Sequence, residues 1–591
     1  MTLQKWSSLP YLDAIRPEPG WRVENAIVAT YSADLVAVVA ALLAFAGLDD
    51  DRGSGTKIDL AEACEMLRRR VRFVVQRGRV SLPRKTSRIV GICDQFIREV
   101  PADERERSWH PKTTVVCYRN DTDGRRVWRL WLGSRNLTQD ISWDTGLLLT
   151  GTPGQRGTIV PGIPLLVKKL AEFAELPEML RFKIGGVQWH SPAGTSIVDV
   201  KLLCPGDVRD IPSEPSGVSD LLLVSPFLDA KTVRKFGKWG TGDKTQRAIL
   251  STGTALAKLV AQSKNPLSSY TEKLYLDEAH TDEPNPEFDE AMELDEDVSR
   301  GLHAKILSVK HSLGCTLWVG SANATNRGWS ENYEVLAELK ADETVYNGLR
   351  AFADAAQEFD PLIPPVIDPV DPVEKDLADA RNEVAATWDV QRMIHADRNE
   401  LVTRIPPHPQ RPEIVLEVGI LGEKLHLWPR GVQSFSLPLV PRPRDSEFIH
   451  IRLAMNGKFL EWCQRVSVNP PLGEERDRLA FASYLGPRMF LQWLRSLLLD
   501  SAVSNGGGDW TSEKSSVTDS RASFQMELIA PSIEDILRAW TRNRKTLADI
   551  NSRVTSFLKA FEHREIDATP EELTEIEKFR DLWKMITQGL V

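Results

Sequence analysis

The chain has 591 residues, of which 42% are hydrophobic and 27% are charged, and its formal net charge is −9. A chain of this length exceeds what one hydrophobic core usually supports, so two or three globular domains are expected. The acidic balance argues against a protein that coats nucleic acid over its whole surface, although it leaves room for local basic patches. The six cysteines are scattered without a CxxC pair. This disfavours a zinc ribbon or a disulfide framework and suits a reducing compartment.

The N-terminal part of the sequence predicts neither a secretory signal nor a membrane span. The opening residues, MTLQKWSSLPYLDAIRPEPG, lack the apolar stretch behind a basic start that a secretory signal requires. The longest apolar run, Leu35–Ala46, lies between Asp34 and Gly47 and is shorter than the about 20 residues that cross a bilayer. It predicts a buried helix, and we expect a cytoplasmic protein that does not contact membranes.

Residues 1–212 form the first predicted domain, an α/β unit in which apolar strands alternate with helices. Strand-like runs occur at Ala26–Ser32, Val71–Gln76 and Arg88–Asp94. Further along, the turn-prone residues RNDTDGRR join the apolar segments KTTVVCYRN and RRVWRLWLGS, which predicts a β-hairpin.

Residues 213–360 form the second predicted domain, in which a similar run of elements occurs again. The segments DLLLVSPFLDAKTVRKF, RAILSTG, KLYLDEA, HAKILSVKH and CTLWVGSAN alternate between strand and helix patterns. Finding this order twice indicates an internal duplication.

A change in composition marks the end of the duplicated region. The segment 361–375 is rich in proline and acidic residues, which predicts a linker rather than a helix or a central strand. Residues 376–591 are predicted to form an α+β C-terminal domain of unknown role. Its pattern predicts a long polar helix over Glu374–Arg404, alternating strands in EIVLEVGI, KLHLWPRG and FIHIRLAMNG, and amphipathic helices near the end. The glycine run within Ser504–Asp509 predicts a flexible loop.

Two segments of the duplicated region carry the same polar residues in the same order. Each has an HxK triplet that opens an alternating strand and a GSxN tetrad that closes the next strand. These residues are His110, Lys112, Ser134 and Asn136 in the first segment, and His303, Lys305, Ser321 and Asn323 in the second. Side chains at positions i and i+2 of a strand share a face. Each histidine therefore projects together with its lysine, and the end of the next strand can bring the asparagine beside them.

These residue types suit the chemistry of a phosphodiester. Lysine and asparagine can donate hydrogen bonds to the phosphoryl oxygens as negative charge grows on them. A neutral imidazole can attack phosphorus and form a covalent phosphohistidine, while a second imidazole protonates the leaving oxygen and later activates water. One half supplies one imidazole, so two copies are needed, and this chemistry calls for neither a metal nor a cofactor.

The pattern resembles the phospholipase D superfamily, whose members bring two HxK…GSxN repeats together across a pseudo-twofold axis. The resemblance implies an α/β fold in which two phospholipase D-like α/β/α sandwich repeats form a pseudo-dimer, followed here by the α+β domain. It covers about Val23 to Lys340 in layout, and the two motif segments are its specific part.

One departure narrows the resemblance. The commonest superfamily pattern has an aspartate five residues after the lysine, where this chain has Cys117 and Lys310. Because it lacks this aspartate, the motif resembles the HKN variant of tyrosyl-DNA phosphodiesterases and phospholipase D-like nucleases. The stretch LWVGSANATNRGW resembles the second motif of the same branch. Glu334 stands where the superfamily often has an acidic residue that orients a histidine. Asp144 is the candidate for the same part in the first half.

The resemblance also implies roles for the motif residues. The first-half histidine is usually the nucleophile in related enzymes, so His110 is expected to attack phosphorus and His303 to act as general acid and base. The other predicted catalytic residues are Lys112, Lys305, Asn136 and Asn323, which hold phosphoryl oxygens, and Ser134 and Ser321, which support them.

Basic and aromatic residues predict contacts with a polyanion. Lysine and arginine bind phosphates, and aromatic rings stack on bases. The predicted substrate-binding residues are Arg68, Arg69, Arg70, Arg72, Arg135 and Trp329. The alternative interpretation is that the arginine-rich segment forms a solvated face and that the tryptophans pack in the core. An acidic run, Asp282–Asp297, predicts a loop beside the site.

The leading hypothesis is a metal-independent nuclease that cleaves nucleic acid, DNA rather than RNA, within a multi-protein defence or DNA-processing system. Three alternatives stay open: a DNA-end repair phosphodiesterase of the tyrosyl-DNA phosphodiesterase type, a phospholipid phosphodiesterase, and a non-catalytic nucleic-acid-binding subunit of a larger complex. A protein partner or a second copy of the chain is expected to dock on the C-terminal domain.

Overall fold

The structure is a computed structural model that describes most of the chain. The described residues are 11–49, 55–82, 88–138, 142–154, 157–206, 212–240, 244–262, 264–276, 301–364, 371–499, 531, 533–542, 550–551, 554–555, 557–558, 561 and 569–590. The acidic run Asp282–Asp297 and the glycine run Ser504–Asp509 lie outside these ranges, so the predictions made for them are not tested.

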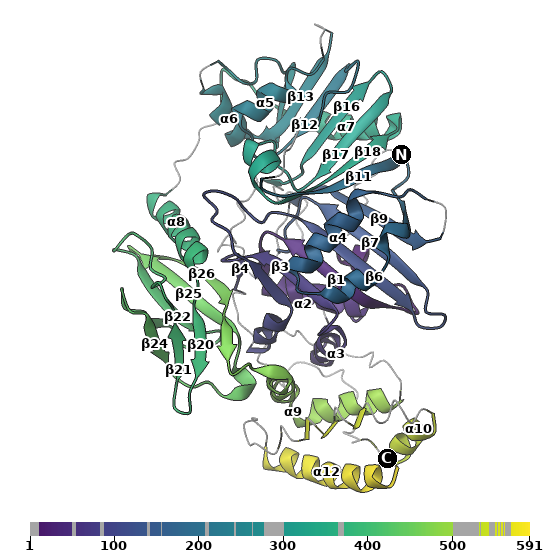
Figure 1. The fold of residues 1–591 in the computed structure, drawn as a ribbon, viewed down its shortest axis with the longest axis vertical. Coiled ribbons are helices and arrows are strands. Elements are labelled where there is room, and N and C mark those ends of the chain that lie inside the picture. Colours follow the sequence, from purple (N-terminus) through teal and green to yellow (C-terminus); the bar gives the residue numbers. More distant parts are fainter. Residues whose placement is uncertain are drawn as a thin grey trace, which may run out of the picture.

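In the described part of the chain, seven strands form a first sheet that has helices on both faces (Figure 1). In spatial order they are β10 (Val187–His190), β9 (Gly146–Pro153), β7 (Arg126–Gly133), β6 (Thr113–Asn120), β1 (Trp21–Thr30), β3 (Val71–Gln76) and β5 (Ile97–Val100). Val28 packs in a core with α2 (Leu35–Ala46) and α3 (Lys57–Leu67), whereas Ile27 packs in a second core with α4 (Gly162–Phe173). Neighbouring residues of a strand point to opposite faces, which explains why this strand is apolar on both sides.

Eight strands of the described residues form a second sheet. In spatial order they are β11 (Thr195–Leu203), β18 (Glu334–Ala341), β17 (Gly314–Gly320), β16 (Ile306–His311), β12 (Asp220–Val224), β13 (Gln246–Thr252), β14 (Glu272–Leu276) and β19 (Gln357–Glu358). Leu221 packs with α5 (Ala230–Phe236) and α6 (Gly253–Val260). Leu222 faces the other way and joins the same core as Ile27. The two sheets therefore share one hydrophobic core.

The two sheets also share an arrangement of strands. The central strand of each, β1 or β12, pairs in parallel with the next strand of its own sheet along the chain, β3 or β13. On its other edge it pairs antiparallel with the strand that opens after the HxK triplet, β6 or β16. Antiparallel β6–β7 and β16–β17 hairpins follow, as the turn signals predict for the first of them.

Two features differ from the sequence-based prediction: the end of the first domain and the type of one element. Strand β11 falls within the predicted first domain, 1–212, yet it pairs with β18 of the second sheet. The predicted strand Arg88–Asp94 forms a 3-10 helix, η1 (Arg88–Gln95), and the strand β5 follows it. An apolar run of this length does not by itself distinguish a buried strand from a buried helical turn.

The apolar run Leu35–Ala46 forms the buried helix α2, as predicted. The Asp34 side chain accepts a hydrogen bond from the backbone N–H of Val36 at 2.6 Å, which caps the first turn. Gly47 ends the helix with φ at 69°, a left-handed conformation that favours glycine.

The start of the C-terminal region differs more strongly from the prediction. The long helix predicted over Glu374–Arg404 is wrong, because α8 (Pro372–Thr387) is followed by the strands β20 (Gln391–Ile394) and β21 (Asn399–Val402). Helix α8 also begins inside the predicted linker 361–375, since proline is well tolerated in a first helical turn. The Asp371 side chain accepts from the backbone N–H of Val373 at 2.7 Å and caps this turn.

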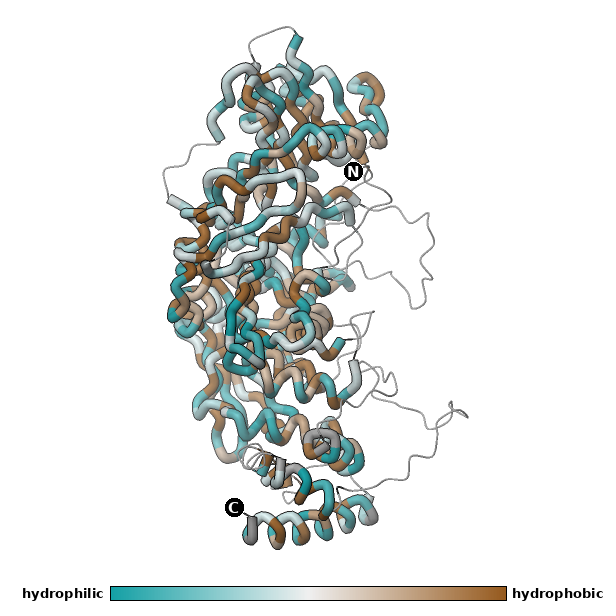
Figure 2. The backbone as a smooth tube through the Cα atoms, turned by 90° about the vertical axis from the view of Figure 1, so that its right-hand side faces the viewer, coloured by the Kyte–Doolittle hydropathy of each residue, from teal (hydrophilic) through white to brown (hydrophobic). Residues whose placement is uncertain are grey.

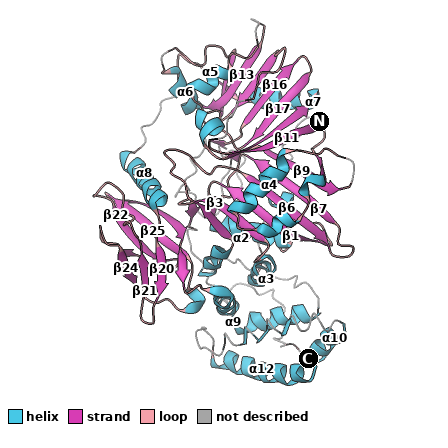
Figure 3. Cartoon of the chain, viewed as in Figure 1, coloured by secondary structure: helices cyan, strands magenta, loops and turns pink. Residues whose placement is uncertain are grey.

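The sheet of the C-terminal region is completed by strands from the first domain. Among the described residues its order is β2 (Ala33–Asp34), β4 (Val80–Ser81), β26 (Lys458–Arg465), β25 (Phe448–Met455), β22 (Val415–Ile420) and β23 (His426–Leu427). A smaller sheet contains β24 (Ser434–Leu437), β21, β20 and β27 (Ser467–Asn469). Figure 3 shows these strands beside the first sheet. The C-terminal region is therefore joined to the first domain by backbone pairing.

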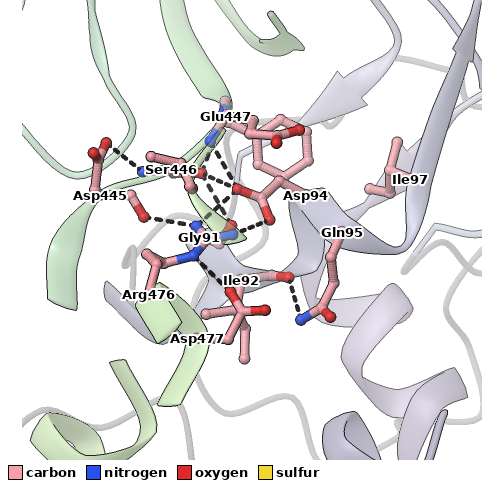
Figure 4. A network of polar contacts seen from close by, with 12 residues as sticks. Gly91, Ile92, Asp94, Gln95, Ile97, Asp445, Ser446, Glu447, Arg476 and Asp477 are labelled. Carbon is pink, nitrogen blue, oxygen red and sulfur yellow. Dashed lines mark hydrogen bonds and ion pairs between the residues drawn. The ribbon is translucent and has the colours of Figure 1, made fainter. Parts of the chain in front are cut away.

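A buried polar network strengthens this junction (Figure 4). The carboxylate of Asp94, in η1, accepts hydrogen bonds from Arg476 Nη1 at 2.9 Å and Nη2 at 2.7 Å. It also accepts from Ser446 Oγ at 3.0 Å and from the backbone N–H of Glu447 at 2.7 Å. Burial alone would raise the pKa of Asp94, but the Arg476 charge and these hydrogen bonds lower it. Asp94 thus ties the first domain to β25 and to α9 (Gly473–Leu499).

The last described elements are the helices α10 (Ile533–Arg542) and α12 (Pro570–Leu590). Apolar and polar positions alternate along α12 in Figure 2, as expected of a helix that covers a core on one side. Within the described ranges, no helix is both long and apolar enough to cross a bilayer.

Candidate active site

The HxK and GSxN residues lie together at one end of the strands in each sheet. Lys112 immediately precedes β6, and its carbonyl accepts a hydrogen bond from the backbone N–H of Gly133, the last residue of β7. This backbone contact places Ser134 and Asn136 next to the first HxK triplet. In the second half, Lys305 precedes β16 and Gly320 ends β17 in the corresponding positions. The hairpin geometry therefore assembles each set of motif residues.

The side chain of His110 is held by a carboxylate from the other half. Its Nδ1 atom lies 2.9 Å from Oε1 and 3.0 Å from Oε2 of Glu334. Glu334 is the first residue of β18 and is fully buried, with 0% of its surface exposed. Because a carboxylate accepts hydrogen bonds, it fixes the imidazole proton on Nδ1. The Nε2 atom then keeps its lone pair and accepts a hydrogen bond from Lys112 Nζ at 2.9 Å.

The side chain of His303 is held in the reciprocal way. Its Nδ1 atom lies 3.1 Å from Oδ1 of Asp144, which belongs to the first half. Burial would raise the pKa of Asp144, but the hydrogen bond and charge of His303, together with Ser142, lower it. The carboxylate therefore stays ionised and can stabilise a protonated imidazole. Asp144 was expected to serve the first half, and the structure places it against the histidine of the second.

The motif serines bind these two carboxylates. Ser134 Oγ donates to Asp144 Oδ1 at 3.0 Å and accepts from the backbone N–H of Thr145 at 2.8 Å. Ser321 Oγ donates to Glu334 Oε2 and accepts from the backbone N–H of Val335 at 3.0 Å. Each serine is thus engaged by the carboxylate that orients the histidine of the opposite half.

The motif lysines and asparagines are buried or nearly so beside the histidines. Lys112 and Lys305 are 1% and 3% exposed, and Lys305 Nζ donates to the carbonyl of His303 at 2.7 Å. Asn136 is buried as well. The buried Oδ1 atom of Asn323 has no hydrogen-bond partner among the described residues. The motif residues of each half can therefore present ammonium and carboxamide donors to one phosphoryl group.

An aromatic residue next to His110 was missed in the sequence. The Tyr31 ring centroid lies 5.1 Å from that of His110 and 5.7 Å from Lys112 Nζ. Its hydroxyl donates to Glu104 Oε2 at 3.1 Å, and the Arg79 guanidinium lies 4.8 Å from its centroid. Tyr31 has no motif partner in the sequence. Tyr31 lies beside His110 because it directly follows β1 and because β1 pairs with β6, the strand that begins after the HxK triplet.

The arginine-rich segment does not reach the strand ends that carry the motif residues. Val71 pairs with Ala26 at the start of β3, whereas the HxK triplet lies beyond Ala29, at the other end of β1. The segment contacts other parts of the fold: Arg68 with Asp477 at 2.9 Å, Arg69 with Glu474 at 2.5 Å, Arg70 with the Val23 carbonyl at 3.2 Å, and Arg72 with the Arg68 carbonyl at 2.6 Å. The four arginines are therefore not placed to contact a substrate bound at the paired histidines.

The last two predicted substrate-binding residues, Trp329 and Arg135, differ in whether they lie near the histidines. Trp329 is 5% exposed and packs edge-on against Phe236 in a hydrophobic core, so its ring face is not available to a base. Arg135 lies between Ser134 and Asn136, is partly exposed, and places Nη1 3.9 Å from Asp144 Oδ2. Arg135 is thus the predicted arginine that the fold brings to the histidines.

The two positions without aspartate lie away from the motif residues. Cys117 is buried in a core within β6, and Lys310 pairs with Glu343 at 2.8 Å on the surface. Among the described residues, no group of three or more histidine, cysteine, aspartate or glutamate side chains could hold a metal ion.

Comparisons with known proteins bear on the second half of the site. Residues 247–356 match the family model described as "Cardiolipin synthase, PLD-like domain", a range that includes His303, Lys305, Asn323 and Glu334. No curated protein matches the chain.

Two solved structures show weak similarity. Polyphosphate kinase from Porphyromonas gingivalis is 13% identical, with 58% of this chain and 46% of that chain covered and a TM-score of 0.29. Phosphatidylserine synthase from Haemophilus influenzae Rd KW20 is 10% identical, with 64% of this chain and 92% of that chain covered and a TM-score of 0.33. The match thus spans less than half of the kinase. Neither likeness carries an argument about this site.

Proposed function

We propose that this chain, a phospholipase D-like enzyme that acts on phosphodiester bonds, cleaves nucleic acid through a covalent phosphohistidine. The observation that carries the proposal is the crossed pair of histidine–carboxylate contacts, His110 with Glu334 and His303 with Asp144. Both imidazoles are held through Nδ1, so Nε2 is the reacting atom of each. Two imidazoles with the same orientation but opposite proton states are what a two-step displacement needs.

The first step is attack on the substrate. Lys112 moves from His110 Nε2 to a phosphoryl oxygen as the diester enters, and the freed lone pair attacks phosphorus. The N–P bond forms as the P–O bond to the leaving group breaks. His303, protonated on Nε2, gives its proton to the leaving oxygen. Lys305, Asn136 and Asn323 donate hydrogen bonds to the remaining oxygens as their charge grows.

The second step releases the product. His303 Nε2, now neutral, takes a proton from water while the water oxygen attacks phosphorus. The N–P bond breaks, its electron pair returns to His110 Nε2, and His303 is again protonated. Asp144 stabilises that imidazolium because its pKa is lowered and it stays ionised. This cycle uses each histidine in one role.

The similar layout of the two sheets supports a further part of the proposal. The two sheets, the first within residues 1–212 and the second formed by β11 and residues 213–360, act as two phospholipase D-like repeats that form a pseudo-dimer around the site, with the segment before α8 as a linker and the remaining residues as an appended α+β domain. The crossed carboxylates support this arrangement, because each half then completes the site of the other.

Basic residues beside the asparagines support nucleic acid as the substrate. Arg135 precedes Asn136, and Arg327 follows Asn323 by four residues. Their side chains are 35% and 44% exposed, so both can reach a bound polyanion. The HKN resemblance supports the same class, with DNA as the expected substrate. Phosphates on either side of the scissile bond can pair with these guanidiniums.

A phosphatidyl substrate is the second candidate, because the description of the matching family names a lipid synthase. Full-length protein is incubated in EDTA with labelled single- and double-stranded DNA, RNA, and phosphatidylcholine vesicles. His110→Ala is compared with His190→Ala, a control histidine that is exposed at the end of β10. Nucleic-acid cleavage that survives EDTA and is lost only in His110→Ala supports the proposal. Turnover of phosphatidylcholine alone favours the lipid, and no turnover of any substrate contradicts both.

The C-terminal region is proposed to bind a protein partner or a second copy of the chain, as part of a defence or DNA-processing system. Its strand β26 is already paired with β4 of the first domain, so a partner bound to this region is linked through the sheet to the first domain. Light scattering of the purified chain tests self-association, and a monomer at all concentrations contradicts the homodimer.

A further inference from the structure

Two buried hydroxyl groups occupy equivalent places at the ends of the two central strands. Thr30 ends β1, and Ser225 directly follows β12. The pairing of Ala29 with Thr113 and of Val224 with Ile306 sets these positions in the same register, since Thr113 and Ile306 each follow the motif lysine. Thr30 and Ser225 are 2% and 1% exposed.

Both hydroxyls make the same pair of hydrogen bonds. Thr30 Oγ1 donates to the carbonyl of Ser32 at 2.8 Å and accepts from the backbone N–H of Leu137 at 3.1 Å. Ser225 Oγ donates to the carbonyl of Phe227 at 2.8 Å and accepts from the backbone N–H of Ala324 at 2.9 Å.

The residues that donate to these hydroxyls directly follow the motif asparagines. Leu137 comes after Asn136, and Ala324 comes after Asn323. Each turn is held a second time by the chain beyond the hydroxyl: Asp34 N–H donates to the Leu137 carbonyl at 2.9 Å, and Asp229 N–H donates to the Ala324 carbonyl at 3.2 Å. The residue that follows each asparagine is therefore fixed through both its backbone N–H and its backbone carbonyl.

We infer that Thr30 and Ser225 are positioning residues that hold the two asparagine turns in the geometry needed to bind the phosphoryl oxygens. Each hydroxyl already donates once and accepts once within the fold, so it acts through the asparagine and not on the substrate. The need for accuracy is physical, because a displacement of about 1 Å in a group that binds the transition state can cost about 100-fold in rate. The inference rests on the proposed phosphodiesterase function.

The two halves differ in one respect that sharpens the test. The N–H of Leu137 also lies 3.3 Å from the carbonyl of Ser32, so it keeps an acceptor when the Thr30 hydroxyl is removed. The corresponding Phe227 carbonyl faces the Ala324 N–H across a β-bridge but makes no hydrogen bond of ordinary geometry with it, so Ser225 Oγ is the acceptor of that N–H among the described residues. Removing the hydroxyl of Ser225 should therefore disturb its turn more than the equivalent change at Thr30.

The experiment compares Ser225→Ala and Thr30→Val with Ser225→Thr and Thr30→Ser, which keep the hydroxyl. Ser308→Ala is the matched control, since Ser308 is a fully buried hydroxyl of β16 that contacts Cys315 and not the asparagine turns. We expect Ser225→Ala to lower kcat by about 100-fold and Thr30→Val by about tenfold, with little change in KM. The hydroxyl-retaining variants and Ser308→Ala should keep the wild-type kcat.

Orthovanadate, which adopts the shape of the phosphoryl transition state, gives a readout that needs no nucleic acid. Its binding is followed by the thermal shift of the full chain. Weaker vanadate binding in Ser225→Ala than in Ser308→Ala supports the positioning role, even if no nucleic acid is cleaved and the proposed substrate is wrong. Equal vanadate binding and equal kcat in folded Ser225→Ala and Thr30→Val overturn the inference while leaving the proposed function intact.

Discussion

The Nδ1 atom of His110 lies 2.9 Å from Oε1 of Glu334, a residue 224 positions further along the chain. The contact crosses from the first sheet to the second, and the contact of His303 with Asp144 crosses back. Each half thus contributes a histidine to its own motif and a carboxylate to the motif of the other. A single half would have an imidazole whose proton position is not fixed.

Removing the charge of either carboxylate should impair catalysis without disrupting the fold. Glu334→Gln and Asp144→Asn keep the side-chain size but lose the negative charge that fixes the proton on Nδ1 and stabilises the imidazolium. Each is expected to lower kcat by about 100-fold. Steady-state kinetics measure this effect. Glu338→Gln, on the same strand as Glu334, is the control and should keep the wild-type rate.

Arg135 should contact a phosphate of the substrate, whereas Arg69 should not. Arg135 lies beside Asp144, while Arg69 is 82% exposed near Glu474 and precedes β3, away from the end of β1 at which the histidines lie. Arg135→Ala is expected to weaken binding of a DNA oligonucleotide and to reduce the slope of log K against log salt by about 1. Fluorescence anisotropy at several salt concentrations measures both quantities. An equal loss in Arg69→Ala would show that the arginine-rich segment binds substrate after all.

The junction between the first domain and the C-terminal region should depend strongly on Asp94. Its carboxylate accepts two hydrogen bonds from Arg476, which is 3% exposed, so Asp94→Ala leaves this buried charge with Asp477 as its one close carboxylate among the described residues. Loss of one member of such a pair costs about 3–5 kcal/mol of unfolding free energy. Urea denaturation measures this loss. Asp103→Ala, which removes an exposed ion pair with Arg105, should leave the midpoint unchanged.

The stability of the protein should fall as pH rises from about 4.5 to about 7. Burial raises the pKa of Glu99 to about 7, against an ordinary value of 4.5, and the nearby Arg465 and Arg77 offset only part of this. Between these two values the folded state binds more protons than the unfolded state, so the unfolding free energy decreases with increasing pH. Burial likewise raises the pKa of Asp477 to about 6, with the same sign.

Glu99→Gln tests this prediction. The variant should flatten part of the fall in unfolding free energy between about pH 4.5 and 7 and leave the part that comes from Asp477. Urea denaturation at a series of pH values measures the slope. An unchanged slope in Glu99→Gln would mean that Glu99 is ionised throughout this range.

The sequence was most informative where neighbours along the chain determine the structure. The HxK spacing and the β6–β7 turn are local, and the buried helix α2 is delimited by Asp34 and Gly47. Helix α8 shows the limit of such patterns. The polar residues after Thr387 suit a helix as well as the strands that they form, and tertiary pairing of β20 with β27 decides between these structures.

Long-range placement could not be predicted from the same patterns. The arginines at 68–72 precede and begin β3, and the direction of this strand places them away from the strand ends that carry the motif residues. Glu334 and Asp144 are candidates from the sequence, and the structure places each beside a histidine. Which histidine each contacts depends on how the two sheets pack, and residue spacing does not contain that information. The contribution of Ala33–Asp34 and Val80–Ser81 to the C-terminal sheet is hidden for the same reason.

The most direct test of the central claim is to trap the phosphorylated enzyme. Radiolabelled substrate is mixed with His303→Ala, with His110→Ala and with the wild-type chain, and each is quenched in alkali, in which phosphohistidine survives. His303→Ala should accumulate label on His110, because the imidazole that activates water for release is missing. His110→Ala should carry no label. Absence of label in both variants, or label on His303 in His110→Ala at wild-type turnover, would contradict the assignment of His110 as nucleophile.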